Sequence, residues 1–418
     1  MKSRTVLVFL FSLSAFIGGR AQPVDTVKLE QLLRAHASPF LKQVLDHPEV
    51  YHYQLIYTQI DRDRKNRPVL RNYSFRLDTC DYFNPASMAK LPTAIMALEK
   101  LNTLRPKGIG LDTPMLTDSA YGGQTRVEKD TSAANGWPTV GHYVKKIFLV
   151  SDNDAYNRLY EFVGQEMLNT RLREMGYSGS RITRRFVTMT EDQNRHTNPI
   201  RFTGEDGRLL YEQPAAFNRQ AFDFSKRILV GKAHYNRNDS LLNQPMDFTT
   251  HNCLPLPDLQ RMMQAVIFPN SVPGNQRFQL DENDRKFLLK YMSKLPSESR
   301  FPNYDTSAFF DSYTKFFFFK DGRRKLPPSI RSFNKTGWSY GYLIDVCYIV
   351  DFAHKVEYML SGVIYVNSDE VLNDDKYEYE SIGYPFFREV GEIIHAHELQ
   401  RKRKRQPDLS SFQFNYAD

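Results

Sequence analysis

The chain has 418 residues, of which 41% are hydrophobic and 25% are charged. These values are typical of a folded globular protein, and the length is sufficient for a large core. The one long apolar run lies at the N-terminus, which excludes a membrane protein with several spans. Three cysteines exclude a fold built on a framework of disulfides, and the formal net charge of +8 is moderate.

The N-terminal residues 1–21 have the pattern of a signal peptide. Lys2 and Arg4 precede an apolar run at residues 6–17, and Gly19 and Ala21 supply small residues at the −3 and −1 positions of a cleavage site. An uncleaved anchor is the alternative, but this run is short for a bilayer span. We therefore expect cleavage after Ala21, no stable membrane anchor afterwards, and a protein that works outside the cytoplasm.

The first half of the chain predicts a helix, a hairpin and three further helices. An amphipathic pattern predicts a helix over residues 25–46. Two segments rich in β-branched and aromatic residues then predict a β-hairpin. The hairpin strands are 51–60 and 69–77, and the helices that follow are 87–101, 139–150 and 154–175, the last ending at Gly176.

The second half begins with a segment that is hard to interpret and ends in regular structure. Residues 188–330 mix polar loops and short apolar pieces, which is consistent with a large helical lobe with insertions or with several surface loops. Strands at 343–352 and 356–366 and a helix at 379–400 follow. Since strands occur near both ends with helices between them, we expect the two ends to share one antiparallel sheet.

The first motif that could take part in catalysis is Ser87-Met88-Ala89-Lys90, at the start of a predicted helix. A serine and a lysine three residues apart lie on one helix face. A nearby amine with a lowered pKa can take the proton of the hydroxyl and make it a nucleophile. Such a pair also occurs by chance, as an exposed serine and lysine in a first helical turn.

The second and third motifs are Ser151-Asp152-Asn153 and Lys335-Thr336-Gly337. On a turn between two helices, the first of these could relay a proton and hold a carbonyl, although Ser, Asp and Asn are also ordinary N-caps. On a strand, the second could offer positive charge, a hydroxyl and a close backbone approach to a substrate carboxylate. An edge-strand lysine followed by a turn glycine is the alternative.

The three motifs occur in one order, each in the element that its chemistry needs. This pattern resembles the penicillin-recognising serine hydrolases, and within them the class A β-lactamase-like group. The resemblance implies an α+β fold, with a five-stranded antiparallel sheet flanked by helices, an all-helical lobe, and the active site between them. It implies a catalytic domain over residues 22–400 with an enlarged 188–330 region, followed by a basic tail at 401–418.

The resemblance also implies a role for each motif residue. Ser87 is the acylated nucleophile, Lys90 its proton acceptor and Ser151 a proton shuttle. The implied substrate-binding residues are Asn153, Lys335, Thr336, Gly337 and Trp338, of which Lys335 and Thr336 hold a carboxylate and Trp338 shares an oxyanion hole with Ser87 through backbone N–H groups. Neither a cofactor nor a metal is expected.

One position departs from the class A pattern. Those enzymes carry a glutamate that activates the water for release of the acyl-enzyme. Here Arg184-Arg185-Phe186 resembles the approach to that position, but Val187 stands where the glutamate is expected. Glu191 is the candidate substitute, Asp192 is a weaker one, and a solvated loop carboxylate is the alternative for Glu191.

The remaining signals are weak. His395 and His397 are two apart on a helix and point in different directions, which disfavours a metal site. Cys80, Cys253 and Cys347 permit one disulfide at most, and the sequence does not choose a pair. The run 401–405 is entirely basic. We expect a solvated helix end, with contact to anionic lipid or polymer as the alternative. Since the run lacks interleaved aromatics, we expect no nucleic-acid partner.

Three functions therefore remain open. The first is an exported class A β-lactamase that hydrolyses β-lactam amides through an acyl-serine, with the periplasm as the expected location, or else secretion. The second is a cell-wall D,D-peptidase or acyl-transfer enzyme that acts on peptidoglycan peptides and turns β-lactams over slowly. The third is a non-catalytic penicillin-binding sensor. Sequence alone does not give the oligomeric state.

Overall fold

The computed structural model describes residues 26–320, 322–323 and 326–417. The predicted signal peptide lies outside these residues. Within them, no helix is long and apolar enough to span a bilayer.

The centre of the molecule is a five-stranded antiparallel sheet in the order β12-β13-β14-β1-β2. The strands from the two ends of the chain meet where β1 pairs with β14, so the predicted shared sheet is confirmed. Its strands are β1 (Gln54–Arg62), β2 (Pro68–Phe75), β12 (Ile330–Ser339), β13 (Tyr342–Asp351) and β14 (Val356–Tyr365).

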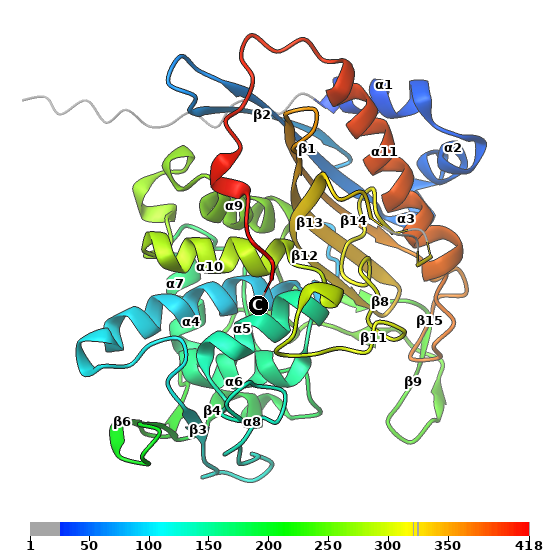
Figure 1. The fold of residues 1–418 in the computed structure, drawn as a ribbon. Coiled ribbons are helices and arrows are strands. Elements are labelled where there is room, and N and C mark those ends of the chain that lie inside the picture. Colours follow the sequence, from blue (N-terminus) through cyan, green and yellow to red (C-terminus); the bar gives the residue numbers. More distant parts are fainter. Residues whose placement is uncertain (1–25, 321, 324–325, 418) are drawn as a thin grey trace, which may run out of the picture.

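Both faces of this sheet are covered by helices (Figure 1). Along β14, Tyr358 and Leu360 belong to one buried apolar cluster and Met359 and Val363 to another. This alternation follows from the two-residue period of a strand. One face packs against α1 (Thr26–His36), α2 (Pro39–Asp46) and α11 (Tyr384–Gln400), with α3 (Pro48–Tyr51) and the π-helical turn η6 (Tyr379–Gly383) beside them.

The opposite face packs against a helical lobe that carries most of the larger apolar cluster. Its main helices are α4 (Lys90–Leu104), α5 (Val140–Val150), α6 (Asn153–Val163), α7 (Gln165–Glu174), α9 (Leu256–Ile267) and α10 (Glu282–Ser293). Short helical turns accompany them: η1 (Ala86–Ala89), η2 (Arg105–Lys107), α8 (Glu191–Arg195), η3 (Pro269–Ser271), η4 (Gly274–Gln276), η5 (Pro296–Glu298) and η7 (Ser410–Phe412).

Short strands form small two- and three-stranded sheets outside the central sheet. They are β3 (Met115–Thr117), β4 (His196–Thr197), β5 (Ile200–Thr203), β6 (Leu209–Gln213), β7 (Ala216–Phe217), β8 (Leu229–Val230), β9 (Ala233–Tyr235), β10 (Leu241–Leu242), β11 (Met246–Asp247) and β15 (Val371–Leu372). We call residues 228–247, which carry β8 to β11, the arm. The region 188–330, which the sequence did not resolve into elements, thus contributes α9 and α10 to the helical lobe and also forms surface loops.

Two long helices predicted from the sequence are wrong as single elements. The first breaks into α1 and α2 because Ser38 caps α2 through Leu41 N–H and Pro39 occupies its first turn. The second breaks into α6 and α7 at Gly164, whose φ of +92° a helix does not permit. The hairpins, the helix that ends at Gln400 and the helices at 87–101 and 139–150 are confirmed within a few residues.

The C-terminal basic run is only partly solvated. Arg401 and Arg403 both pair with the fully buried Glu398 and are themselves largely buried. After them the chain folds back onto the helical lobe, where Leu409 and Phe412 join the core. Part of the basic run therefore neutralises a buried carboxylate instead of forming a solvated helix end.

Candidate active site

Ser87 lies in η1 at the rim of the sheet, directly before α4. Its neighbours Ala86, Met88 and Ala89 are buried, whereas Ser87 is half-exposed. Ala86 has a φ of +46°, a left-handed value that is strained for a residue with a Cβ. The turn thereby presents a serine at the surface while its flanks are fixed in the core.

Lys90 lies one turn later, with no exposed surface. Its Nζ is 2.9 Å from Ser87 Oγ, 2.6 Å from Asn153 Oδ1 and 3.3 Å from Ser151 Oγ. Burial, reinforced by the charge of Lys335, holds the pKa of Lys90 well below its ordinary range. A neutral amine at this distance can accept the proton of Ser87.

The Ser151-Asp152-Asn153 turn serves both as a cap and as part of the site. Asp152 accepts from Ala155 N–H at 2.8 Å and so caps α6. Ser151 ends α5 in the left-handed conformation, with φ of +61°. This bend places Ser151 and Asn153 on either side of the amine of Lys90, so the capping and catalytic interpretations are compatible.

Lys335 on β12 completes the polar cluster from the sheet. Its Nζ lies 2.9 Å from Ser151 Oγ. Burial lowers the pKa of Lys335 to about 7, against an opposing contribution from Asp345. The strand can come this close because Gly337 faces η1, where a Cβ would lie 2.8 Å from Pro85 O and 3.0 Å from Ser87 N. Gly337 therefore brings the next residue, Trp338, beside the nucleophile.

Thr336 does not lie where the sequence placed it. Adjacent residues of a strand point to opposite faces, so Thr336 lies on the face away from Lys335. Its side chain is fully buried, and within the described residues its Oγ1 has no hydrogen-bond partner. The predicted contact of the Thr336 hydroxyl with a substrate carboxylate is therefore not available in this structure.

A cleft with a volume of about 620 Å³ opens over Ser87. Of the predicted site residues, Ser87, Asn153 and Trp338 line it, while Lys90, Ser151 and Lys335 lie buried behind them. No Asp or Glu occurs among the described residues that line the cleft. The lining is instead rich in Arg, His, Asn and Tyr.

Glu191 is not brought to this cleft. It begins α8, is about half-exposed, and pairs with Arg195 at 3.2 Å. Asp192 is also exposed and accepts from Tyr121 Oη at 2.7 Å. Val187 lines the cleft at the position where a glutamate was expected, so the described structure places no substitute carboxylate there.

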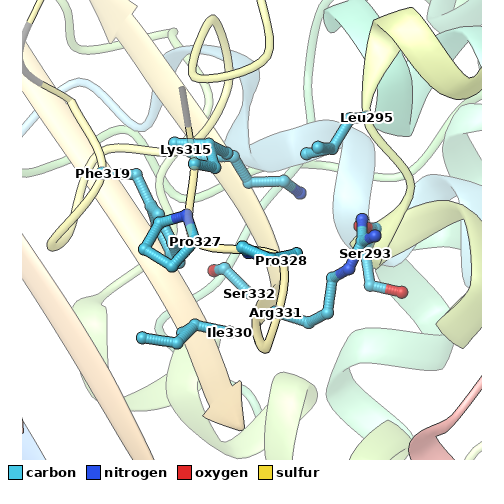
Figure 2. Close-up of a pocket in the computed structure, with 10 residues that line it drawn as sticks. Ser293, Leu295, Lys315, Phe319, Pro327, Pro328, Ile330, Arg331 and Ser332 are labelled. Atoms are coloured by element: carbon cyan, nitrogen blue, oxygen red, sulfur yellow. The ribbon is translucent and has the colours of Figure 1, made fainter. Parts of the chain in front are cut away.

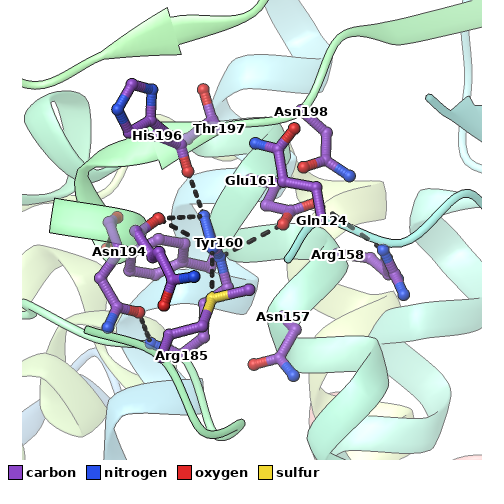
Figure 3. Close-up of polar contacts among 12 residues, drawn as sticks. Gln124, Asn157, Arg158, Tyr160, Glu161, Arg185, Asn194, His196, Thr197 and Asn198 are labelled. Carbon is purple, nitrogen blue, oxygen red and sulfur yellow. Dashed lines mark hydrogen bonds and ion pairs between the residues drawn. The ribbon is translucent and has the colours of Figure 1, made fainter. Parts of the chain in front are cut away.

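The loop that carries Val187 is held by a buried arginine (Figure 3). Arg185 is 1% exposed and pairs through Nε with Glu161 Oε1 at 3.2 Å. It also donates to the backbone carbonyl of His196, while Asn194 Oδ1 accepts from Arg185 N–H at 2.8 Å. Burial raises the pKa of Glu161 to about 7 despite its two arginine neighbours.

The other candidate groups do not line the cleft over Ser87. Lys315 lines a small separate cavity of about 30 Å³ between α10 and β12 (Figure 2). His395 contacts Tyr358 and Asp351, and no group of metal-ligating side chains occurs in the described part of the chain. The three cysteines are free, with Cys80 exposed and Cys347 buried.

Comparison with known proteins gives a partial family match. Residues 63–236, less than half of the chain, match the model of the beta-lactamase enzyme family. The chain resembles the penicillin-recognising serine enzymes. Its α+β fold is β-lactamase-like, and the match includes the first two motifs but ends before Lys335. No curated protein matches the chain.

Solved β-lactamases are similar to the chain at low identity. The enzyme from Sphaerobacter thermophilus is 13% identical, with a TM-score of 0.45 and coverage of 91% of this chain and 100% of that one. A β-lactamase from Xanthomonas campestris is 12% identical, with a TM-score of 0.46 and coverage of 88% and 96%. One from Streptosporangium roseum is 14% identical, with a TM-score of 0.44 and coverage of 89% and 97%.

Several residues of the cleft were not found from the sequence. Phe186 places its ring 4.9 Å from Lys90 Nζ, and Arg184, His251 and Tyr235 line the wall. Arg184 and Phe186 entered the sequence analysis only as the approach to the expected glutamate, and their place in the cleft wall was not predicted. No motif marks His251 or Tyr235, whose contacts are with residues far apart in the chain. The strand alternation that displaces Thr336 could have been inferred from the sequence.

Proposed function

We propose that the chain is a serine hydrolase of the β-lactamase type that opens β-lactam amides through an acyl-serine on Ser87. The single observation that carries this proposal is the 2.9 Å separation of Ser87 Oγ from the buried amine of Lys90. Neutral Lys90 takes the hydroxyl proton, and Ser87 Oγ attacks the amide carbonyl carbon. In this proposal the backbone N–H groups of Ser87 and Trp338 receive the oxyanion.

Collapse of this intermediate breaks the amide C–N bond, and the leaving nitrogen needs a proton. Ser151 is suited to supply it, since its Oγ lies between the amines of Lys90 and Lys335. The proton that Lys90 accepted can return through Ser151 to the nitrogen. Each step uses side chains that already touch one another.

Release of the acyl group is the second half of the reaction. Water must attack the ester, and a positioned base contributes about 10²–10⁴ in rate. No carboxylate lines the described cleft, so we propose Lys90 as the base for this step and expect slow turnover. This feature favours the second candidate, a cell-wall D,D-peptidase or acyl-transfer enzyme with slow β-lactam release.

An intact-mass time course with excess benzylpenicillin, run while drug loss is followed, separates the candidates. Drug loss with return of the protein to its original mass would support a β-lactamase. A persistent adduct with drug loss near stoichiometric would support the peptidase or acyl-transfer function, and a D-Ala-D-Ala peptide assay would then separate an enzyme from a sensor. No adduct at any time together with no loss of drug would contradict all of these functions.

We also propose export to the periplasm or beyond, with cleavage after Ala21. The charged start, apolar run and small residues at 19 and 21 support this location. Cell fractionation followed by N-terminal sequencing tests it. A protein that begins at Gln22 outside the cytoplasm is expected, and a cytoplasmic protein that retains residues 1–21 would contradict it.

A further inference from the structure

The wall of the cleft that Arg184 and the arm form holds cations that no nearby acid neutralises. Arg184 is half-buried and lines the cleft. Within the described residues, no carboxylate lies within ion-pair distance of its guanidinium, and the same is true of Arg237 at the tip of the arm. Most other buried or half-buried arginines of the protein, such as Arg62 and Arg185, do have such a partner.

Arg184 is nevertheless fixed in place. Its backbone N–H donates to Asn252 Oδ1 at 3.1 Å, and its guanidinium contacts His251 Nε2. Burial and the charge of Arg184 lower the pKa of His251 to about 3, so this ring is neutral and accepts a hydrogen bond. A guanidinium carries five N–H donors in a planar fork, and this contact uses only part of them.

The arm that carries Arg237 is also held in place by packing and hydrogen bonds. Its base packs Ile228, Phe248 and Leu372 into a separate apolar cluster. β9 pairs with β15, and Asn373 Nδ2 donates to Tyr235 O at 3.0 Å. The arm is thereby joined to the segment after β14, and it holds Tyr235, Asn236 and Arg237 over the cleft.

Anion recognition at Lys335 is limited by burial. Lys335 is 2% exposed, does not line the cleft, and lies beside the hydroxyl of Ser151. Thr336 points to the other face of the sheet. The accessible cations of the cleft therefore include Arg184 and Arg237, and a planar guanidinium suits a carboxylate in a bidentate contact.

We propose that Arg184, supported by Arg237, forms an anion subsite that recognises a second carboxylate of the substrate, away from the amide that Ser87 attacks. The proposal rests on the proposed function, because the ligand is the acyl-donating amide itself. It deepens that function by naming the substrate class as amides with an additional acidic group, such as an acidic peptide.

Two penicillins that differ by one carboxylate test this proposal. Carbenicillin has a carboxylate in the acyl side chain that benzylpenicillin lacks, and both share the ring carboxylate. In Arg184→Gln we expect the second-order acylation rate with carbenicillin to fall about tenfold, while the rate with benzylpenicillin changes less than twofold. Arg208→Gln, an exposed arginine outside the cleft, removes the same charge and should change neither rate.

Equilibrium binding keeps the test independent of acylation. Ser87→Ala cannot form the ester, and we expect it to bind carbenicillin more tightly than benzylpenicillin in calorimetry. Ser87→Ala/Arg184→Gln should lose that preference. An equal loss for both drugs would overturn the proposal, because Arg184 would then bind the ring carboxylate. Absence of any preference in Ser87→Ala would also overturn it, whereas failure of acylation alone contradicts only the proposed function.

Discussion

Lys90 and Lys335 converge on one hydroxyl: their Nζ atoms lie 3.3 and 2.9 Å from Ser151 Oγ. Two ammonium groups this close and this deeply buried repel each other, so the site favours the loss of at least one proton. The pKa values of Lys90 and Lys335 are both lowered, chiefly by burial. The site thus holds a base next to a proton donor.

This arrangement predicts a pH dependence set by Lys335. Its pKa of about 7 means that the ammonium is lost as the pH rises through 7, whereas an ordinary lysine keeps its proton to about pH 10. If its charge promotes acylation, the second-order acylation rate should fall above pH 7. In Lys335→Arg the charge persists, so the fall should disappear between pH 7 and 9. An unchanged alkaline fall in this variant, with the fold intact by circular dichroism, would contradict the assignment.

Gly337 is predicted to be intolerant of a single methyl group. In Gly337→Ala the new Cβ would lie 2.8 Å from a backbone carbonyl and 3.0 Å from Ser87 N, which displaces the strand from η1. We expect a loss of about 1–3 kcal/mol in the free energy of unfolding and an acylation rate lower by about 10²–10³, the effect of losing an oxyanion donor.

The matched control is Gly110→Ala, where an added Cβ meets no atom within 4 Å. It should leave the free energy of unfolding, measured by urea denaturation, and the acylation rate, measured by stopped flow, nearly unchanged. Full activity of Gly337→Ala would show that the strand does not contribute to the site as described.

The buried pair Arg185–Glu161 is predicted to stabilise the loop that carries Val187. Arg185→Met leaves a buried carboxylate without its nearest ion-pair partner, and removal of one member of such a pair costs about 3–5 kcal/mol in the free energy of unfolding. Arg67→Met, which breaks an exposed pair with Asp63, should cost less than about 1 kcal/mol. Equal costs for the two variants in urea denaturation would mean that burial of the Arg185 pair does not matter.

Glu191 is predicted to be dispensable for release of the acyl group. It is exposed, pairs with Arg195 and does not line the cleft. Glu191→Gln should therefore change the release rate of a penicilloyl adduct by less than twofold, as measured by the decay of adduct mass. A slowing of tenfold or more would place this carboxylate near the ester during turnover.

The sequence predicted the parts of the site that depend on local pattern. Ser87 and Lys90 share a helical turn, and the strands at both ends of the chain form one sheet because their apolar residues alternate on two buried faces. The sequence analysis missed two breaks in predicted helices, each caused by a single residue. Pro39 starts a new helix, and Gly164 takes a positive φ that ends one. Both signals are local, because a proline and a glycine are each residues that commonly interrupt a helix.

The wall of the cleft that Arg184 and the arm form could not be predicted in this way. Arg184 and Asn252 are 68 residues apart, and their contact depends on how the region 181–252 folds over the lobe. The same holds for Asn373 and Tyr235, which are 138 residues apart. Helix and strand periodicity relates only residues that are close in the sequence, so the contacts that form this surface are seen only in the folded structure.

Peptide mapping by mass spectrometry, after brief exposure of the mature protein to benzylpenicillin, tests directly whether Ser87 is the acylated residue. We expect a penicilloyl group on the peptide that contains Ser87 and on no other peptide. We also expect the group to be absent from Ser87→Ala and to form about 10²–10⁴ times more slowly in Lys90→Met. An adduct on another residue, or its persistence in Ser87→Ala, would contradict the assignment of the active site.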